Sequence, residues 1–359
     1  MGYRSLGRTL LLLLPAAAAA LQAAHLRPRP HAAVGSVAVV ERLSPGCADC
    51  VADFHAAVAR CAAAQPRPCT VLFAPGSYPW RLPAAPAEDA SGAVVRGARA
   101  LRIEGLGATL VVNSDNGFHG ALRFIDCVNL TVSGLTLDMD QPPYVLGQVV
   151  QRVNASAFKL RYDPGDYPAR EESPRPWHRF WHALTQWDPA GGHFTAGIDA
   201  YSYGLPVSPV PGEADTLLVS QITPVPRNDT WLVLRHMVGG GSGCNSVGGC
   251  FGIELYRCAN VTVQRVHWAT GVSFALYVHY SHTISLLNNR VVPREGRPMS
   301  VTADASHLVM TTGTVDVKGG EYAGMGDDGI NLHNMWVEAL AAGAQPAQLR
   351  LNARACKRG

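Results

Sequence analysis

Three aspartates, Asp304, Asp327 and Asp328, are the residues of this sequence best suited to acid–base chemistry. They form two clusters, because Asp304 precedes the Asp327–Asp328 pair by 23 residues. That spacing is close to the length of one coil in a parallel β-solenoid, where each coil adds one strand to a stack. Neighbouring strands in a sheet lie about 4.8 Å apart. A solenoid would therefore make the two clusters direct neighbours.

Clustered carboxylates are suited to cleaving a glycosidic bond. Inverting hydrolysis needs a protonated carboxyl group beside the leaving oxygen and an ionised carboxylate about 6.5–9.5 Å away that activates water. Like charges raise one another's pKa, which keeps one carboxyl group protonated near neutral pH. In a regular strand Asp327 and Asp328 point to opposite faces. Both can act at one site only if Gly324, Gly326 and Gly329 bend the backbone there.

Other functions suit the same carboxylates. Clusters of oxygen ligands bind calcium, and a calcium-dependent polysaccharide lyase would add a base, for which Arg297 is the candidate. A polygalacturonase-like hydrolase is a further alternative. The aspartates also suit solvated turns of a catalytically inactive, carbohydrate-binding solenoid. Since an Asp-Asp pair is common, the pair alone does not separate these functions.

The elements that would position the aspartates are short and β-prone. Triplets with apolar first and third residues occur at residues 101–103, 130–132, 261–263, 284–286 and 315–317. This alternation is typical of strands with one buried face. The strings CVNLTV at 127–132 and CANVTV at 258–263 are near copies of one another, which indicates a stacked architecture.

We therefore predict an all-β chain, a right-handed parallel β-helix of the pectin-lyase type with an inserted subdomain. Residues 36–140 would form an N-terminal cap and the first coils. Residues 141–240 interrupt the triplets and would form a β-subdomain of barrel type. Residues 241–334 would be the coils that carry the aspartates, and the Ala-rich residues 335–359 form an atypical tail.

The N-terminal cap has a helix signal and a cysteine signal. The apolar residues between positions 50 and 61 follow helical spacing, and a helix there would plug the end of the solenoid. The chain contains nine cysteines, four of them at positions 47, 50, 61 and 69. A single Cys-x-x-Cys is a weak zinc signal, so we expect disulfides among these four.

Residues 1–24 have the pattern of a secretory signal peptide, with early arginines, an apolar run and small residues at the end. No later segment is apolar over about 18 residues. We therefore expect a secreted or lumenal protein with no membrane span after cleavage. Four Asn-x-Ser/Thr sequons agree with glycosylation in that compartment, at Asn129, Asn154, Asn228 and Asn260. Asn129 and Asn260 also suit turns of a solenoid.

The charge balance excludes one class of partner. The formal net charge is +3, and it falls to +1 without Arg4 and Arg8 of the leader. A nearly neutral chain argues against nucleic acid as the main partner. The sequence makes no prediction of the oligomeric state.

Longer strings around the aspartates resemble one known family. RPMSVTADASH at residues 297–307 and GDDGINLH at 326–333 are similar to two signature stretches of glycoside hydrolase family 110. The similarity is strongest over residues 239–333. These enzymes are secreted exo-acting α-1,3-galactosidases that fold as a right-handed parallel β-helix with inserted β-barrel elements. The resemblance implies inverting hydrolysis of terminal α-galactosyl glycans, with no metal or other cofactor.

The resemblance also implies residue roles. The catalytic residues would be Asp304, Asp327 and Asp328. By similarity to polygalacturonases, Asp327 would be the general acid, and Asp304 and Asp328 would position the attacking water. Sugar binding or tuning of the carboxylates would fall to Arg297, His307, Asn331 and His333. Each of these four residues equally suits a structural role in a solenoid turn or stack.

The C-terminus departs from that family. Its members continue for several coils after the Asp-Asp motif, whereas residues 335–359 here are Ala-rich and basic. A solenoid that ended there would leave an open edge and an incomplete groove. We therefore expect a truncated or degenerate relative, and catalytic activity depends on which of these it is.

Overall fold

The computed structural model describes residues 38–81, 92–113, 120–164, 181–201, 205–236, 250–334, 338–342 and 349–352. All described residues belong to one compact unit, Val37–Gly359. The leader predicted at residues 1–24 lies outside the described residues, as does most of the predicted tail. The described part contains one α-helix and is otherwise built of strands, which confirms the all-β class.

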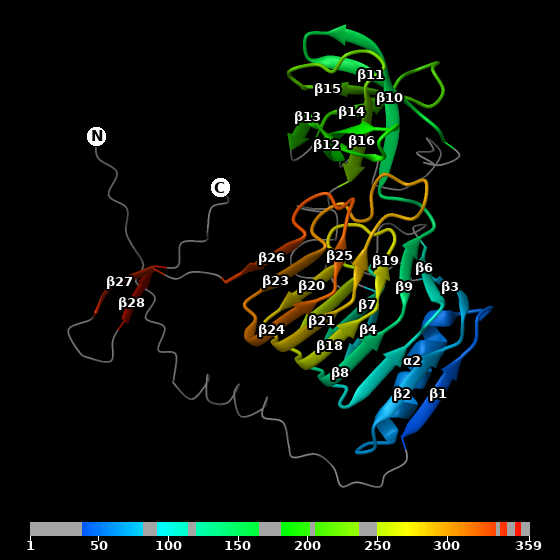
Figure 1. Ribbon diagram of the computed structural model, residues 1–359, viewed down its shortest axis with the longest axis vertical. Helices are drawn as coiled ribbons and strands as arrows, with labels where there is room; N and C mark the ends of the chain where they lie inside the picture. The colour runs from blue at the N-terminus through cyan, green and yellow to red at the C-terminus, as the bar shows by residue number, and fades with distance from the viewer. Residues whose placement is uncertain are drawn as a thin grey trace. The chain divides into compact units, whose positions relative to one another are not determined.

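Three parallel sheets make up most of this unit (Figure 1). Sheet A consists, in spatial order, of β1 (Val39–Leu43), β2 (Cys69–Phe73), β5 (Leu101–Glu104), β8 (Val128–Ser133), β18 (Ala259–Gln264), β21 (His282–Leu287) and β24 (Thr312–Lys318). Sheet B consists of β3 (Gly76–Trp80), β6 (Ala108–Val112), β9 (Thr136–Met139), β19 (His267–Trp268), β22 (Arg290–Val291) and β25 (Glu321–Tyr322). Sheet C consists of β4 (Ala93–Arg96), β7 (Leu122–Ile125), β17 (Ile253–Tyr256), β20 (Leu276–His279), β23 (Ser306–Val309) and β26 (Ile330–His333).

The chain visits the three sheets in a fixed order. Strands β2, β3 and β4 lie in sheets A, B and C, and the same order returns through β24, β25 and β26. Each pass therefore adds one strand to every sheet. Neighbouring strands pair in parallel, as Val261 with Ile284 shows for β18 and β21. Residues one pass apart in sequence consequently lie side by side.

The inward faces of sheets A, B and C share one apolar core. On β18, Val261 and Val263 are buried while Thr262 between them is only half-buried. All five apolar triplets lie in strands of sheet A, so the strand predictions are confirmed. Burying an aliphatic side chain contributes about 1.5–3 kcal/mol. Val315 and Val317 stay half-buried because β24 is the last strand of its sheet.

Two asparagines form a stacked turn. Asn129 and Asn260 have φ angles of 56° and 55°, a left-handed conformation that asparagine tolerates well. The Asn260 side-chain amide donates a hydrogen bond to Asn129 Oδ1 at 3.2 Å. These contacts support the turn interpretation of both positions.

A seven-stranded antiparallel sheet, sheet D, lies between β9 and β17 in the sequence. Its strands are, in spatial order, β13 (His193–Tyr201), β12 (Trp181–Asp188), β16 (Trp231–His236), β10 (Tyr144–Asn154), β11 (Ala157–Tyr162), β15 (Thr216–Ser220) and β14 (Val207–Pro209). Sheet D has an apolar core of its own, in which Phe158, Leu160 and Leu232 are buried. The first strand pairs with the last, Tyr144 opposite Arg235, so the chain enters and leaves sheet D at neighbouring positions. In the tail, β27 (Glu338–Ala342) and β28 (Leu349–Asn352) pair antiparallel.

The predicted cap helix is present as α2 (Cys50–Ala63). Asp49 caps its N-terminus, because its carboxylate accepts a hydrogen bond from the Ala52 N–H at 2.9 Å. The buried face of α2 packs against β1 to β4. Phe54 at its centre stacks on Phe73 with ring centroids 6.0 Å apart. The helix thereby covers the apolar end of the stacked strands.

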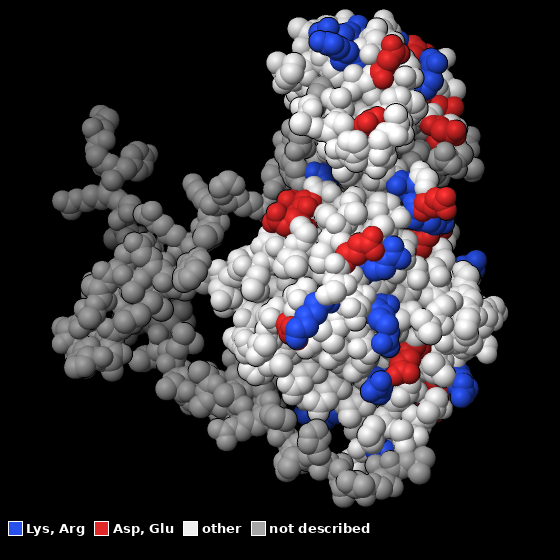
Figure 2. Space-filling model, viewed as in Figure 1, with Lys and Arg blue, Asp and Glu red and all other residues white. Residues whose placement is uncertain are grey.

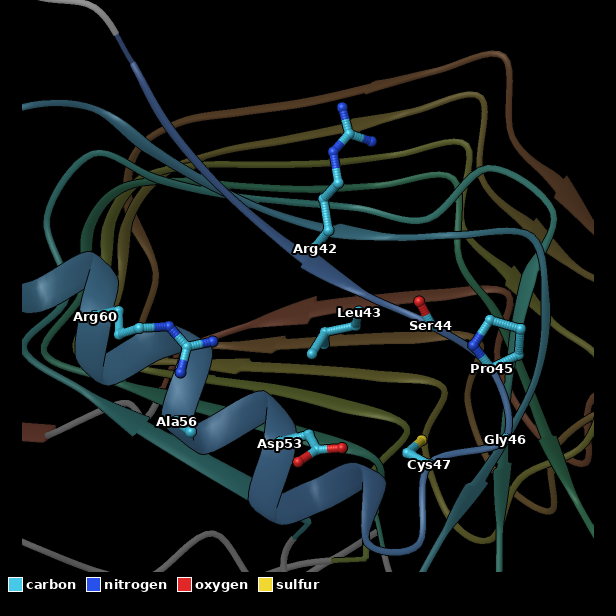
Figure 3. A pocket seen from close by; sticks show the side chains of 9 residues that line it. All are labelled: Arg42, Leu43, Ser44, Pro45, Gly46, Cys47, Asp53, Ala56 and Arg60. Atoms are coloured by element: carbon cyan, nitrogen blue, oxygen red, sulfur yellow. The ribbon is translucent and has the colours of Figure 1, made fainter.

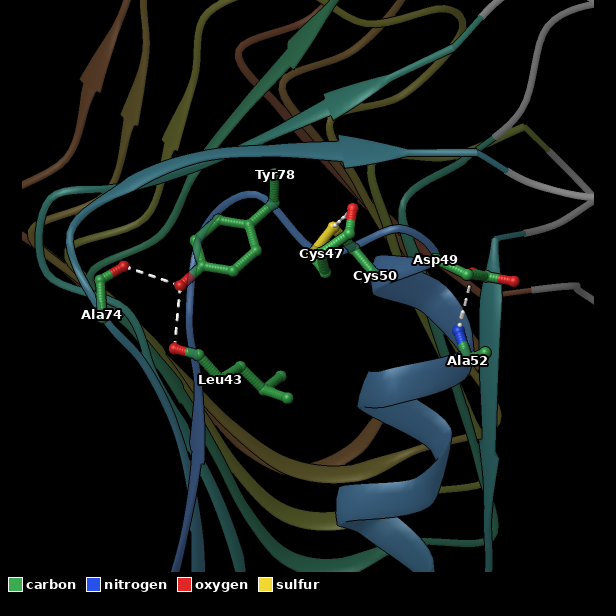
Figure 4. The surroundings of a disulfide bond; sticks show 7 residues. All are labelled: Leu43, Cys47, Asp49, Cys50, Ala52, Ala74 and Tyr78. Atoms are coloured by element: carbon green, nitrogen blue, oxygen red, sulfur yellow. Dashed lines mark hydrogen bonds between the residues drawn. A yellow bond between two sulfur atoms is a disulfide. The ribbon is translucent and has the colours of Figure 1, made fainter.

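Two disulfides tie α2 to its surroundings, Cys47–Cys50 and Cys61–Cys69. The prediction that the first four cysteines pair with one another is confirmed. Figure 4 shows the first bond with Tyr78, whose hydroxyl lies 2.9 Å from the carbonyl oxygens of Leu43 and Ala74. Burial raises the pKa of Tyr78.

An open pocket of about 380 Å³ lies between β1 and α2 (Figure 3). Its charged lining residues are Arg42, Asp53 and Arg60. Arg60 turns its guanidinium to Glu41 at 2.7 Å. None of the three aspartates singled out in the sequence lines this pocket.

Acidic and basic side chains are interspersed on the face shown in Figure 2, and most of that face is uncharged. The ion pairs of the described residues include Arg290 with Glu321 and Lys318 with Asp316. Exposed pairs of this kind contribute about 0–1 kcal/mol each. Within the described ranges, no helix has the length and apolar character needed to cross a membrane.

Candidate active site

The three predicted aspartates lie together. One carboxylate oxygen from each of Asp304, Asp327 and Asp328 lies within 4.8 Å of the others. Asp304 is buried, with 3% of its surface exposed, whereas Asp327 and Asp328 are exposed. The cluster therefore combines one carboxylate held inside the fold with two that face solvent.

The stacking of sheet C brings the two clusters together. Strands β23 and β26 pair with His307 opposite Asn331, an offset of 24 residues. The same offset sets Asp304 beside Asp328, and the Ala305 N–H donates a hydrogen bond to the Asp328 carbonyl oxygen at 2.9 Å. The spacing argument from the sequence is thus confirmed by the strand register.

Glycines let Asp327 and Asp328 share one site. The segment between β25 and β26 is a bend rather than a strand. Gly324 has a φ of +65°, a conformation that side chains other than glycine rarely adopt. A Cβ at position 326 would overlap the Thr302 carbonyl oxygen. The backbone departure that both carboxylates require is therefore present, and it needs glycine at these two positions.

His307 binds the buried aspartate. Its Nδ1 lies 2.5 Å from Asp304 Oδ2, and its Nε2 lies 3.1 Å from Nε2 of His333. The imidazole stacks on Phe274 with ring centroids 4.3 Å apart. If Nδ1 carries the proton toward Asp304, Nε2 accepts from His333 in the neutral ring. His307 and His333 therefore form a hydrogen-bonded line that leads from Asp304 to the exposed edge of β26.

The other two predicted sugar-binding residues are placed differently. Asn331 lies on β26 beside His307 in the register, and it is half-buried. Nη1 of Arg297 donates to Asp138 Oδ1 at 3.1 Å and to Thr270 Oγ1 at 2.6 Å. Arg294 of the same loop also contacts Asp138, at 3.1 Å. The contacts of Arg297 tie the loop before Asp304 to β9.

Aromatic side chains next to His307 are absent from the sequence predictions. Phe274 and Tyr277 both contact the His307 ring, and Phe251 packs on Tyr277 with centroids 4.4 Å apart. Burial, with a contribution from nearby Glu254, raises the pKa of Tyr277 to about 12. Strand register could have identified Tyr277 as a neighbour of the site, because Tyr277 pairs with His307 on the preceding strand of sheet C.

A buried charged network lies further along the same sheet. Glu254 forms an ion pair with Arg123 at 2.9 Å and accepts a hydrogen bond from His279 at 2.9 Å, and all three side chains are buried. Glu254 pairs with Tyr277 in the register. Arg123, Glu254, Tyr277 and His307 therefore occupy one row across sheet C.

The arrangement supports two kinds of chemistry. Three carboxylates this close together suit acid–base catalysis of glycosidic-bond cleavage. Oxygen ligands this close also suit a divalent cation. These three oxygens all lie within 4.8 Å of one another, which is closer than the about 6.5–9.5 Å that separates acid and base in inverting glycosidases. Inversion therefore requires that the acid and the base react through oxygens that lie farther apart than these three, so that a water fits between them.

Comparison with known proteins agrees with the resemblance seen in the sequence. No protein-family model matches the chain. The chain is 24% identical to α-1,3-galactosidase B of Akkermansia muciniphila over 247 residues, which cover 66% of this chain and 29% of that protein. It is 32% identical to α-1,3-galactosidase B of Parabacteroides distasonis over 94 residues, 25% of this chain and 15% of that protein. The matched region spans less than a third of each relative, and within it the chain is similar to proteins named α-1,3-galactosidase.

Proposed function

We propose that this protein is a glycoside hydrolase that removes terminal α-1,3-linked galactose from glycans with inversion. The observation that carries the proposed acid–base hydrolysis is the cluster of Asp304, Asp327 and Asp328, with carboxylate oxygens within 4.8 Å of one another. Inversion is proposed from the family resemblance of residues 297–307 and 326–333. The names of the two relatives supply the substrate class, since both are α-1,3-galactosidases. The proposed partner is therefore a carbohydrate with an α-galactosyl end.

The proposed roles follow from exposure and contacts. Asp327 is exposed and acts as general acid, giving its proton to the glycosidic oxygen as the bond to the anomeric carbon breaks. Asp304 and Asp328 orient a water on the opposite face of the sugar and take up its proton. His307 holds Asp304 in place through their 2.5 Å contact. The protons balance, since the acid loses one and the base gains one in each turnover.

The remaining predicted residues have smaller roles in this proposal. Asn331 and His333 lie on β26, beside the aspartates, and bind sugar hydroxyls. Arg297 acts indirectly, because its guanidinium holds Asp138 and Thr270. Its contacts fix the loop that precedes Asp304.

We also propose that the stacked strands form a right-handed parallel β-helix and that the protein is secreted. The cyclic order of sheets A, B and C supports a parallel β-helix, and a right-handed path is the rule for parallel crossover connections. Sheet D is then an insertion between two coils. Secretion is proposed from the leader pattern at residues 1–24.

Galactose release by the full chain tests the function. The substrate is a galactosyl-α-1,3-galactoside, and proton NMR records the anomer of galactose that forms first. We expect β-galactose, and we expect Asp327→Asn to lose nearly all turnover while its far-ultraviolet circular dichroism stays unchanged. The matched control is Asp316→Asn, which removes an aspartate of sheet A whose partner is Lys318. Undiminished turnover in Asp327→Asn would sink the assignment, and α-galactose as first product would replace inversion by retention.

A calcium-dependent polysaccharide lyase is the second candidate. The observation that favours it is the same close set of three carboxylates, which offers three oxygen ligands to a cation. A lyase forms an unsaturated product that absorbs ultraviolet light, whereas hydrolysis forms none. The product therefore separates the two candidates.

A further inference from the structure

Arg235 is a charged residue buried inside the protein. It lies on β16, the last strand of sheet D, and 1% of its surface is exposed. A guanidinium carries five N–H donors and no acceptor, and its burial is costly unless acceptors face it. The hydrogen-bond acceptors around Arg235 therefore indicate the role of this buried charge.

Those acceptors belong to both aspartate-bearing segments. Nη1 of Arg235 donates to the Thr302 carbonyl oxygen at 3.3 Å and also to the Gly326 carbonyl oxygen. Thr302 lies two residues before Asp304, and Gly326 directly precedes Asp327. One guanidinium thus joins two segments that are a full pass apart in sequence.

The contact of Arg235 with both carbonyl groups requires glycine at position 326. A Cβ built on Gly326 would overlap Nη1 of Arg235 and the Thr302 carbonyl. The Gly326 N–H donates to the Val301 carbonyl oxygen at 2.9 Å. The absence of a side chain therefore lets the guanidinium reach both carbonyl groups at once.

Tyr144 makes a second contact of the same kind. It is the cross-strand partner of Arg235 in sheet D. Its buried hydroxyl donates to the Met299 carbonyl oxygen at 2.7 Å. Met299 itself is buried in the core of sheet D. Two neighbouring residues of sheet D therefore hold the backbone from Met299 to Thr302, immediately before Asp304.

We propose that Arg235 is a positioning residue, through which sheet D fixes the relative placement of Asp304 and Asp327. The inference rests on the proposed function for its effect on turnover, but not for its effect on the backbone. The guanidinium sets the two carbonyl groups, and the carbonyl groups set the direction in which each following aspartate leaves the chain. A misplacement of about 1 Å at a reacting group is enough to slow catalysis on the order of 100-fold.

Kinetics of full-length variants test the role in turnover. Arg235→Met keeps the side-chain bulk and removes every donor, and we expect kcat to fall on the order of 100-fold while KM changes far less. Arg235→Lys keeps the charge without the planar fork, and we expect an intermediate loss. The matched control is Arg123→Lys, which alters another buried arginine, one that forms an ion pair with Glu254. Equal losses in kcat for Arg123→Lys and Arg235→Lys would overturn a specific positioning role.

Hydrogen–deuterium exchange tests the role in the backbone. The reporters are the amides of Ala305 and Gly326, which donate to Asp328 and Val301. In Arg235→Lys both should exchange faster, while the Val263 amide of sheet A stays protected. Unchanged exchange at both reporters together with unchanged kcat would overturn the proposal. If the two amides exchange faster in Arg235→Lys but the wild type releases no galactose, Arg235 still positions the backbone and the proposed function is rejected.

A second variant decides the matter if Arg235 variants do not fold. Tyr144→Phe keeps the buried ring and removes only the hydrogen bond to Met299. We expect faster exchange at Ala305 and a reduced kcat with a native circular dichroism spectrum. If sheet D did not position the aspartates, both quantities would match those of the wild type.

Discussion

Asp304 Oδ2 and His307 Nδ1 lie 2.5 Å apart, three positions from each other on one short segment. The segment is fixed on both sides, because Ala275 N–H donates to the Asp304 carbonyl oxygen at 3.0 Å and the His307 ring stacks on Phe274. The buried aspartate therefore has an orientation set by its own histidine. The two exposed aspartates approach it from the next pass.

Substitutions of His307 should distinguish the effect of its hydrogen bond with Asp304 from that of its stack on Phe274. His307→Phe keeps the stack on Phe274 and removes both ring nitrogens, so Asp304 loses its partner. A hydrogen bond to a charged group contributes about 1.5–3 kcal/mol, and we expect kcat to fall on the order of 10- to 100-fold. His307→Asn places a donor near the position of Nδ1 and should retain more activity. Equal activity of the two variants in the galactose-release assay would contradict this role.

Gly326→Ala should be damaging, and Gly329→Ala should be tolerated. The added methyl group at position 326 overlaps the Thr302 carbonyl and the Arg235 guanidinium. Overpacking of this kind costs about 1–3 kcal/mol, measured as a lower urea midpoint, and it should also reduce kcat. At position 329 the nearest atom, Tyr322 Cβ, is 4.0 Å from the built Cβ. A tolerated Gly326→Ala variant would show that this segment can move without loss.

Tyr277 should make the protein less stable at high pH. Its pKa in the folded state is raised to about 12, whereas tyrosine in the unfolded chain titrates near 10. The folded state therefore keeps a proton that the unfolded state releases. The stabilisation is complete below about pH 10 and is lost as the pH rises toward 12, about 3 kcal/mol in all.

The measurement for Tyr277 is urea unfolding at pH 9 and pH 11. Tyr277→Phe keeps the packing on Phe251 and removes the titrating hydroxyl. Its free energy of unfolding should fall less between the two pH values than that of the wild type. Tyr280→Phe, at a position that is 45% exposed, is the control and should behave as the wild type. An equal fall in wild type and Tyr277→Phe would refute the prediction.

Removal of divalent cations should leave galactose release unchanged. The proposed reaction uses only carboxyl groups and water, so dialysis against EGTA should alter neither kcat nor KM. The control is the same assay with calcium restored to the dialysed protein. Activity that disappears with EGTA and returns with calcium, together with an unsaturated product, would favour the lyase.

Contacts within the stacked strands could be predicted from the sequence. Strand pairing in sheet C has a constant offset from Asp304 to Asp328, and the same offset is visible in the spacing of the motifs. The helix α2 and the strands of sheet A were predicted for a similar reason, since helical spacing and in–out alternation are local patterns. Features with a fixed period are readable without the structure.

Contacts between sheet D and the stacked strands could not be predicted. Arg235 lies 91 residues before Gly326, and no periodicity connects the two positions. Arg297 and Asp138, which both lie outside sheet D, are 159 residues apart, and no periodicity connects these two positions either. A sugar-binding role for Arg297 is predicted from its place in a motif, whereas its contacts depend on where the loop folds back. Residues that hold a site from a different sheet carry no local signal.

The place of sheet D in the sequence has a consequence for the order of folding. Strands β8 and β18 pair directly, although Asn129 and Asn260 at their turn are 131 residues apart. Closing so long a loop is entropically costly and slow. Pairing of Tyr144 with Arg235 within sheet D brings the ends of this loop together. We therefore expect sheet D to form before β17 and the later strands join sheets A, B and C. During synthesis, the stack would stop growing after β9 and resume only once β16 has been made.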